Sequence, residues 1–227
     1  MTSRRTVTVD PHLHTVASYD GHTTPEQLLD TAERVGLDAV VVTDHDTVEG
    51  AHVAKTLAAG RDIVAVVGCE VSTADGHLLT IGVDDAPEPG RPLPATAQSV
   101  RDAGGLAVVP HPFQRSRHGA RGDAIRAVDG IEVHNAHTVL NIRNSQARRF
   151  AVRHRHQMFG GSDAHRPENV GLAATEVPLS AGTELTEASL LRAMRNGGTA
   201  AVGRRTSAWQ YVSKLFSNAR HRTAALM

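Results

Sequence analysis

Cysteine and long apolar runs are nearly absent from this sequence, and each absence excludes a class of protein. The single cysteine, Cys69, cannot form a disulfide within the chain, so a disulfide-stabilised scaffold is excluded and a reducing compartment is favoured. The first residues lead into Thr6–Val9 without the apolar stretch of a secretion signal. No segment has the roughly 20 consecutive apolar residues that a membrane span requires. We therefore expect a cytoplasmic protein without a membrane span.

Net charge and aromatic side chains are scarce as well. The 24 Lys and Arg residues balance 24 Asp and Glu residues, so no overall field attracts nucleic acid or a membrane, although a local patch is not excluded. Only 3% of the residues are aromatic, yet 14 are histidine. Many histidines in such a chain suggest metal binding or catalysis, and their positions must decide.

Strand-like and helix-like segments alternate nearly throughout the 227 residues. The first predicted helix has Thr24 as its N-cap, Pro25 in its first turn and Gln27 in a capping box, and it ends at Gly36. The predicted strands are 6–9, 37–42, 63–67, 78–83, 106–109, 131–133, 158–160 and 199–202, and further helices are predicted at 48–59, 95–103, 140–154 and 187–195. This alternation predicts an α/β domain with a parallel sheet covered by helices.

Most histidines and carboxylates with metal-binding potential directly follow predicted strands. They are Asp10, His12 and His14 after 6–9, Asp44, His45 and Asp46 after 37–42, Glu70 after 63–67, His111 after 106–109, and Asp163 and His165 after 158–160. His77 opens the strand at 78–83. Because the carboxyl ends of parallel strands share one face of a sheet or barrel, we expect these side chains to converge.

The spacing of two pairs indicates shared ligation. Residues i and i+2 of an extended segment point the same way, so His12 and His14 can reach one ion, as can Asp163 and His165. Imidazole and carboxylate ligands without thiolates suit Zn, Mn or Fe in an open, catalytic type of site. Each motif alone could be a hydrogen-bonded turn or a packed histidine, but their recurrence at five strand ends favours a metal site.

At these residues the sequence resembles the PHP family, named for the polymerase and histidinol phosphatase proteins. The resemblance spans about residues 6–203 and rests on Asp10-Pro11-His12-Leu13-His14-Thr15, Ser18-Tyr19-Asp20-Gly21, Thr43-Asp44-His45-Asp46-Thr47, Gly68-Cys69-Glu70-Val71, Pro110-His111-Pro112 and Gly161-Ser162-Asp163-Ala164-His165. It implies a distorted seven-stranded (β/α) barrel with two or three divalent ions, commonly Mn, Fe or Zn. Many family members hydrolyse phosphate esters.

The resemblance also implies which side chains bind each ion. His12, His14, Glu70 and Asp163 would bind a first ion, Glu70, His77 and His111 a second with Glu70 as the bridge, and Asp20, His45 and His165 a third. The expected reaction is hydrolysis of a phosphate ester by a hydroxide that bridges two metals, with Asp163 and His165 among the catalytic residues.

Further residues have expected roles with simpler alternatives. His134 follows a predicted strand and would either donate a proton to the leaving oxygen or make a structural hydrogen bond. Substrate phosphate is expected to contact Arg115, Arg117, Arg121 and Asn135, with a solvated basic loop as the alternative for the arginines. Asp10, Asp44 and Asp46 are expected to orient imidazoles by accepting their second N–H, with a plain turn as the alternative. We assign His118 and His137 to the surface.

The expected partner is a small phosphorylated substrate such as a nucleotide. Larger relatives carry an inserted domain between the positions of His77 and His111, where this chain has only 33 residues, so a nucleotide or RNA substrate cannot be carried over. Two other functions stay open: an amidohydrolase-like metal-dependent hydrolase and a non-catalytic, metal-stabilised interaction module. Neither Lys55 nor Lys214 follows a strand as an amidohydrolase lysine would, and the full ligand set argues against the module.

We expect one domain at 1–203 and a basic helical tail at 204–227. The tail has no acidic residue, and Trp209, Val212, Leu215 and Phe216 recur at roughly helical spacing. A helix packed on the barrel is the simplest interpretation, and contact with a membrane surface, RNA or a partner is the alternative.

Overall fold

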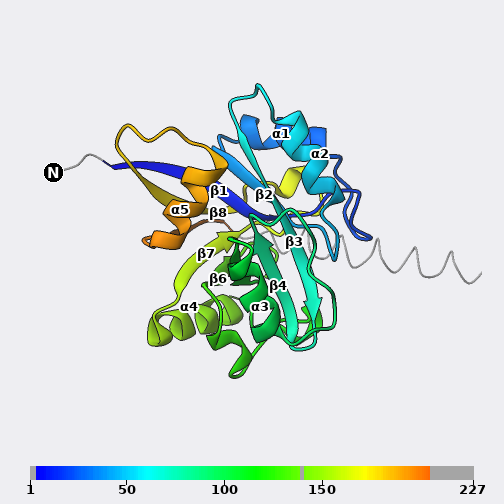
Figure 1. Cartoon of the computed structure of the whole chain (residues 1–227), viewed down its shortest axis with the longest axis vertical. Helices are drawn as coiled ribbons and strands as arrows, with labels where there is room; N and C mark the ends of the chain where they lie inside the picture. Colours follow the sequence, from blue (N-terminus) through cyan, green and yellow to red (C-terminus); the bar gives the residue numbers. More distant parts are fainter. Residues whose placement is uncertain (1–3, 139–140, 205–227) are drawn as a thin grey trace, which may run out of the picture.

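A curved sheet with helices on its outside forms the part of the chain that the structure, a computed structural model, describes: residues 4–138 and 141–204 (Figure 1). Its nine strands are β1 Arg4–Leu13, β2 Ala39–Val42, β3 Val64–Thr73, β4 Gly76–Ile81, β5 Leu106–Val109, β6 Gly130–Asn135, β7 Gln157–Gly161, β8 Ala173–Ser180 and β9 Ala200–Gly203. They lie in the order β7-β6-β5-β4-β3-β2-β1-β8-β9. The described residues therefore give nine strands where the family resemblance implied seven.

The pairing is mixed, so the prediction of a parallel sheet was only partly correct. β1, β2 and β3 run parallel to one another, as do β5, β6 and β7. β4 is antiparallel to both β3 and β5. Its direction relative to β3 follows from the short connection of Ala74 and Asp75, because a turn of two residues joins only antiparallel strands. β8 is antiparallel to β1 and β9 and was not predicted. Its Pro178 weakens the strand signal.

The two ends of the sheet approach each other and nearly close it into a barrel. Beyond β7, the amide of Asp163 donates to the His12 carbonyl at 2.9 Å, and the amide of His14 donates to the Ala164 carbonyl at 2.9 Å. A Cβ on Gly160 would lie 2.5 Å from the Ala174 carbonyl oxygen, so glycine is needed where β7 meets β8. The closure brings the ends of β1 and β7 together.

In the described part of the chain, five α-helices cover the outside of the sheet: α1 Pro25–Arg34, α2 Glu49–Leu57, α3 Leu93–Asp102, α4 Ile142–His154 and α5 Glu187–Asn196. The capping box of α1 forms as predicted, with Thr24 and Gln27 exchanging hydrogen bonds. α3 begins two residues earlier than predicted, because Pro92 and Pro94 fit the N-cap and the first turn. Figure 1 shows α1 and α2 together at one end of the molecule and α3 and α4 together at the other.

Alternating side chains divide the apolar core. Ala39 and Val41 of β2 pack inside the barrel with Phe159, whereas Val40 and Val42 pack toward α1 and α2. A third cluster lies beneath α3 and α4. This layering fills the barrel interior, so the polar side chains at the strand ends are confined to one mouth of the barrel.

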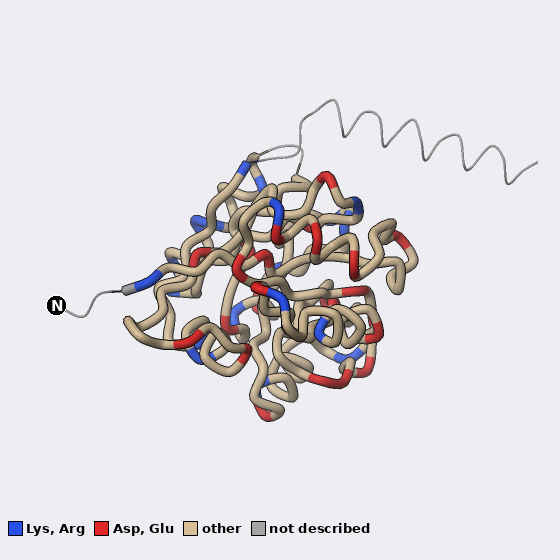
Figure 2. Tube along the Cα trace, turned by 90° about the horizontal axis from the view of Figure 1, so that it is seen from above, with Lys and Arg blue, Asp and Glu red and all other residues tan. Residues whose placement is uncertain are grey.

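Basic and acidic residues are spread over the trace without separating into two halves (Figure 2). Among the described residues, no helix is long and apolar enough to cross a membrane. The tail predicted at 204–227 lies outside the described residues except for Arg204.

Candidate metal centre

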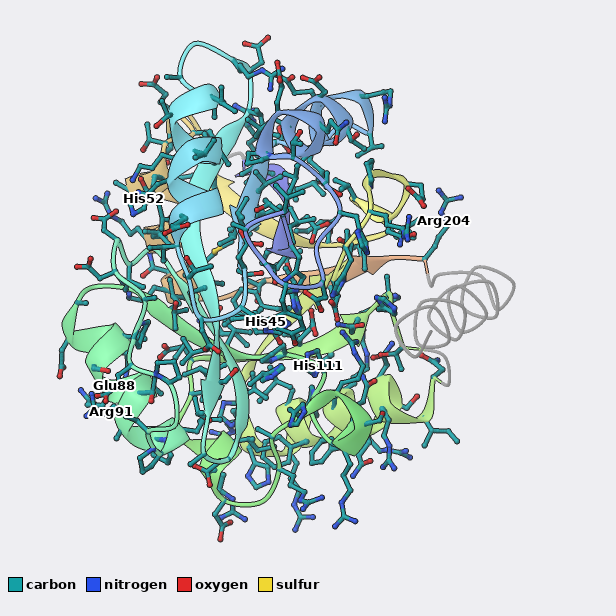
Figure 3. All side chains as sticks on the ribbon, turned by 90° about the vertical axis from the view of Figure 1, so that its right-hand side faces the viewer. His45, His52, Glu88, Arg91, His111 and Arg204 are labelled. Carbon is teal, nitrogen blue, oxygen red and sulfur yellow. The ribbon has the colours of Figure 1, made fainter. Side chains whose placement is uncertain are left out.

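All nine side chains expected to bind metal are brought together at the mouth of the barrel. They form five overlapping groups of three, and within each group the ligand atoms lie within 4.8 Å of one another. The groups are His12-His111-Asp163, His12-His14-Glu70, His14-Asp163-His165, His14-Asp20-His45 and His45-Glu70-His77. Figure 3 shows His45 and His111 near the middle of the molecule, whereas His52 and Arg91 lie at its edge.

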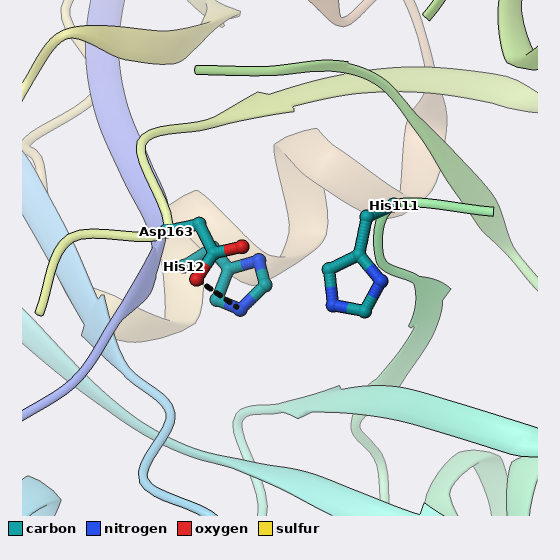
Figure 4. A group of neighbouring side chains, drawn as sticks. All are labelled: His12, His111 and Asp163. Carbon is teal, nitrogen blue, oxygen red and sulfur yellow. Dashed lines mark ion pairs between the residues drawn. The ribbon is translucent and has the colours of Figure 1, made fainter. Parts of the chain in front are cut away.

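Four ligand atoms surround one point at the end of β1. Glu70 Oε2 lies 3.1 Å from His12 Nε2 and 3.2 Å from His14 Nε2. Asp163 Oδ1 lies 3.7 and 3.6 Å from the same two nitrogens, and Figure 4 shows this carboxylate beside His12, with His111 in the same group. Bonds of about 2.0–2.2 Å to a tetrahedral ion place ligands roughly 3.3–3.6 Å apart. The spacing therefore fits a cation at the centre of the four atoms.

Glu70 faces two sets of histidines with its two oxygens. While Oε2 faces His12 and His14, Oε1 lies 2.8 Å from His77 Nδ1 and 3.0 Å from His111 Nε2. The Glu70 side chain is 1% exposed, and a carboxylate is costly to bury without such partners. This geometry suits a carboxylate that bridges two ions.

A third group of ligand atoms lies nearest the solvent. Asp20 Oδ2 is 2.9 Å from His165 Nε2 and 3.7 Å from His45 Nε2. The Asp20 side chain is 32% exposed, and the hydroxyl of Ser18 donates to its other oxygen at 2.9 Å. A ligand entering from solvent would reach this group first.

Most ligands of the cluster, but not His12, are already in the protonation state that cation binding requires. Burial lowers the pKa of His14 to about 3, so its imidazole is neutral. Burial alone would raise the pKa of Glu70, but the charge of His12 and hydrogen bonds from His111 and His12 hold it well below its usual range. Burial likewise opposes ionisation of Asp163, and Arg117 and His12 outweigh it and lower that pKa. Neutral imidazoles and ionised carboxylates are the metal-binding forms. Burial opposes a charge on His12, but Asp163 and Glu70 outweigh it and raise the pKa of His12 well above its usual range, so a cation would replace the proton of this ring.

Unsatisfied atoms at the centre test the fit to a cation independently. His14 Nε2 and Asp163 Oδ1 are buried, and neither makes a hydrogen bond of acceptable geometry with the described residues. A buried polar atom without a partner costs about 1–3 kcal/mol. Because the two atoms lie only 3.6 Å apart, one cation would satisfy both.

Glu132 of β6 orients the ligands, although no role was predicted for it. Its Oε1 lies 3.0 Å from His12 Nδ1, the nitrogen that faces away from the cluster. Its Oε2 accepts the backbone N–H of His111 at 2.7 Å and the side-chain N–H of Asn135 at 2.9 Å. A buried glutamate within an apolar strand was the signal that could have identified this residue.

The three aspartates expected to orient imidazoles contact other groups. Asp10 accepts the backbone amides of Ser162 and Gly171, each at 3.0 Å, and burial raises its pKa to about 6. Asp44 accepts the amide and hydroxyl of Thr15 at 2.6 and 2.7 Å. Asp46 accepts the amide of Ser72 at 2.7 Å. These carboxylates hold the ligand-bearing loops, and the imidazole of His12 is oriented by Glu132 instead.

Of the four candidates for phosphate contact, the three arginines line two neighbouring hollows and Asn135 lines neither. Arg117 pairs with Asp163 and lines a pocket of about 280 Å³ above the cluster. Asn135 is buried beneath it and donates to Asp163 Oδ2 at 2.9 Å. Arg115 and Arg121 line an adjoining hollow of about 400 Å³. Asn135 therefore supports a ligand rather than lining the pocket.

His134 is not brought to the cluster. It lines a separate hollow between β6 and α4, and it is not among the residues that line the pocket above the ligands. His165 does line that pocket, and its Nδ1 lies 2.9 Å from the Asp163 carbonyl oxygen. An N–H at Nδ1 would leave Nε2 free to bind a cation.

Three rings at the pocket were missed as site residues. Tyr19 stacks on His45 with ring centroids 4.9 Å apart, and it is 83% exposed. His118 stacks on His77 at 5.4 Å, and His137 meets His165 edge-on at 5.4 Å. The tyrosine lines both the metal pocket and the adjoining hollow. Ring contacts between distant loops have no periodic signal in a sequence.

The chain is similar to several known proteins in sequence or in fold. A family model described as PHP-associated matches residues 141–199. An uncharacterised protein of Methanocaldococcus jannaschii is 31% identical over 125 residues, which are 54% of this chain and 72% of that protein. A 3′,5′-nucleoside bisphosphate phosphatase of Chromobacterium violaceum is 36% identical over 98 residues, or 41% of this chain and 33% of the phosphatase. The crystal structure of PsfC from Pseudomonas syringae covers 98% of this chain and 100% of its own with a TM-score of 0.70 at 20% identity, which shows a shared fold.

Proposed function

The chain belongs to the PHP family, and we propose that it is a metal-dependent phosphoesterase. One observation carries the proposal: Glu70 directs one oxygen at His12 and His14 and the other at His77 and His111, all at 2.8–3.2 Å. This arrangement supports two ions bridged by one carboxylate, which is the geometry of hydrolytic centres that act on phosphate esters.

The nine side chains would hold two or three divalent ions, of Mn, Fe or Zn. The first would lie among His12, His14, Glu70 and Asp163, the second among Glu70, His77 and His111, and the third among Asp20, His45 and His165. When bound, such ions lower the pKa of coordinated water and neutralise charge on phosphate oxygens. Oxygen and nitrogen ligands alone suit all three metals.

Arg117 is the residue best placed to bind the reacting phosphate. Its guanidinium pairs with Asp163, and it lines the pocket directly above the cluster. One quarter of the side chain is exposed, so donor groups remain available to a non-bridging phosphate oxygen. Arg117 would thus orient both a metal ligand and the substrate.

The adjoining hollow suggests the shape of the rest of the substrate. Arg115 and Arg121 line it, and the exposed ring of Tyr19 stands between it and the metal pocket. A planar group stacked on Tyr19 would place a second anionic group near the two arginines. The bisphosphate named for the Chromobacterium violaceum relative has this character, and the matched segment is about a third of that phosphatase. We therefore propose a phosphate ester that carries a second anionic group.

Metal analysis combined with a screen of phosphate esters tests the function. The protein purified with its native metal should release phosphate from p-nitrophenyl phosphate, and His14→Ala and Asp163→Ala should lower metal content and turnover together. His52→Ala is the matched control, because His52 is exposed on α2 and its imidazole hydrogen-bonds the Asp84 carbonyl at 2.8 Å. Normal turnover in both ligand variants would refute the site. Bound metal without hydrolysis of any ester would favour the interaction module, and amide hydrolysis in its place would favour an amidohydrolase.

A further inference from the structure

A hollow lined by arginines lies between α4 and the ends of β6 and β9, outside the metal pocket. Its volume is about 760 Å³. Arg148, Arg149 and Arg153 of α4 line it together with Arg204, and no carboxylate is among its lining residues. Figure 3 shows Arg204 at the edge of the molecule, far from His45 in this view. We call it the α4 hollow.

The positive charge of the α4 hollow is not balanced within the described residues. Among the described residues, the ion pairs are made by other basic side chains, such as Arg5, Arg61 and Arg117. α4 itself, residues 142–154, contains no acidic residue, although the whole chain has equal numbers of basic and acidic residues. Several guanidiniums gathered without a carboxylate repel one another and attract a multiply charged anion.

The remaining lining groups fit a phosphorylated organic molecule. Asn144 and Ser145 offer polar groups at the start of α4, while Val152 offers apolar surface. Val152 is 64% exposed. Pockets for small molecules typically have volumes of about 300–1,000 Å³ and combine apolar surface with a few polar groups. The volume of the α4 hollow lies within that range.

The α4 hollow and the metal pocket share no lining residue, but one contact connects them. The Asn144 side chain hydrogen-bonds the backbone N–H and carbonyl of Asn135, each at 3.2 Å. The Asn135 side chain in turn donates to Asp163 at 2.9 Å. The hollow is therefore a separate site whose wall is attached to a metal ligand.

We propose that the α4 hollow binds a phosphate-bearing small molecule of about nucleotide size, apart from the substrate at the metal centre. Charge selects an anion, the set of guanidiniums along one helix favours phosphate groups over a single carboxylate, and the valine surface accommodates the organic part. The proposal does not depend on the reaction at the metal centre.

Calorimetric titration of the full-length, metal-loaded protein with ADP tests the site. Arg148→Gln/Arg149→Gln should weaken one binding event roughly tenfold or more. The matched control is Arg143→Gln/Arg192→Gln, which removes the same charge from exposed positions that do not line the hollow; Arg143 contacts Gln146 on the same helix. The control should change the affinity less than twofold. Arg153→Gln replaces the double variant if that protein does not fold by circular dichroism.

Arg117→Gln separates the hollow from the metal pocket. The event lost in Arg148→Gln/Arg149→Gln should persist in Arg117→Gln. If ADP binding is lost only in Arg117→Gln, the probe occupies the metal pocket and the proposal is wrong. Equal weakening in both arginine pairs would show unspecific attraction, and no binding of ADP or pyrophosphate to the unaltered protein would also overturn it.

Discussion

The metal centre and the α4 hollow both contain residues of β6, but their charged groups differ in burial and in the partners they have. In the metal centre, Glu70 and Asp163 are almost completely buried, and each has oppositely charged or hydrogen-bonding partners within 4 Å. In the α4 hollow, Arg148 and Arg149 are exposed, and no carboxylate lines the space around them.

This difference follows from the cost of desolvation. A buried charge is tolerated only where partners compensate it, so the groups of the metal centre must be placed accurately by the fold. Exposed arginines keep their water and can lie together without partners at little cost. Removing one charged group should therefore lower the stability of the protein strongly at the metal centre. At the α4 hollow, the same change should have little effect on stability while no ligand is bound.

Removal of metal should give the largest effect, because bound cations would satisfy buried ligand atoms that otherwise lack a partner among the described residues. Dialysis against EDTA should abolish hydrolysis and lower the unfolding free energy by about 3 kcal/mol, the value for a ligand at roughly 100 times its Kd. For a chain of this size the Tm should fall by about 5–10 °C. Differential scanning calorimetry before and after metal is restored measures the change. His14→Ala should respond much less, and an unchanged Tm in the unaltered protein would contradict the proposed centre.

Glu132→Gln should weaken metal binding by about 10–100-fold, the usual cost of losing a group that orients a ligand. Glutamine keeps one oxygen near His12 but lacks the charge and the second acceptor that the His111 amide requires. Titration with Mn²⁺ measures the affinity, and turnover should recover at high metal concentration. Glu176→Gln, on the exposed face of β8, is the matched control. Unchanged affinity for Mn²⁺ would show that His12 is held by its backbone alone.

The positions of most ligands could be predicted because they lie next to a local signal, whereas Asp20 was expected only from the family resemblance. His12 and His14 have a spacing of two at the end of β1, and His111 follows β5. Glu70 was expected just after a strand and lies inside β3, which continues to Thr73. A single property of parallel strands places these side chains at one mouth. The structure brings all nine expected ligands together.

The supporting contacts could not be predicted because they depend on how the barrel closes. Glu132 and His12 are 120 residues apart, and their contact requires the ends of β1 and β7 to meet. The strand at β4 was predicted but its direction was not, because apolar runs identify a strand and do not give its direction. β8 was not predicted at all, and Pro178, which pairs with Thr6 of β1, weakens its signal.

Arg117→Gln and Arg149→Gln make the same chemical change in the two regions. Arg117→Gln removes the partner of buried Asp163 and should lower the unfolding free energy by about 2 kcal/mol in metal-free protein. This is less than the roughly 3–5 kcal/mol of a fully buried pair, because one quarter of Arg117 is exposed. Arg149→Gln should change it by less than about 0.5 kcal/mol. Urea unfolding measures both free energies. An equal loss of stability in the two variants would contradict the view that the charge of Arg117 has a stabilising partner and that of Arg149 has none.

Tyr19→Ala should have the smallest effect on the metal centre, because the ring stacks on the ligand His45 but is itself 83% exposed. Loss of an aromatic contact worth about 0.5–1.5 kcal/mol should raise KM for an aryl phosphate roughly two- to tenfold. KM for glycerol phosphate should stay constant, since that ester has no ring to stack, and Tyr19→Phe should retain both values. A rise in KM for both esters, with loss of metal, would mean that Tyr19 acts through His45 and belongs to the buried centre. A rise for the aryl ester alone, with metal content unchanged, assigns it to substrate recognition.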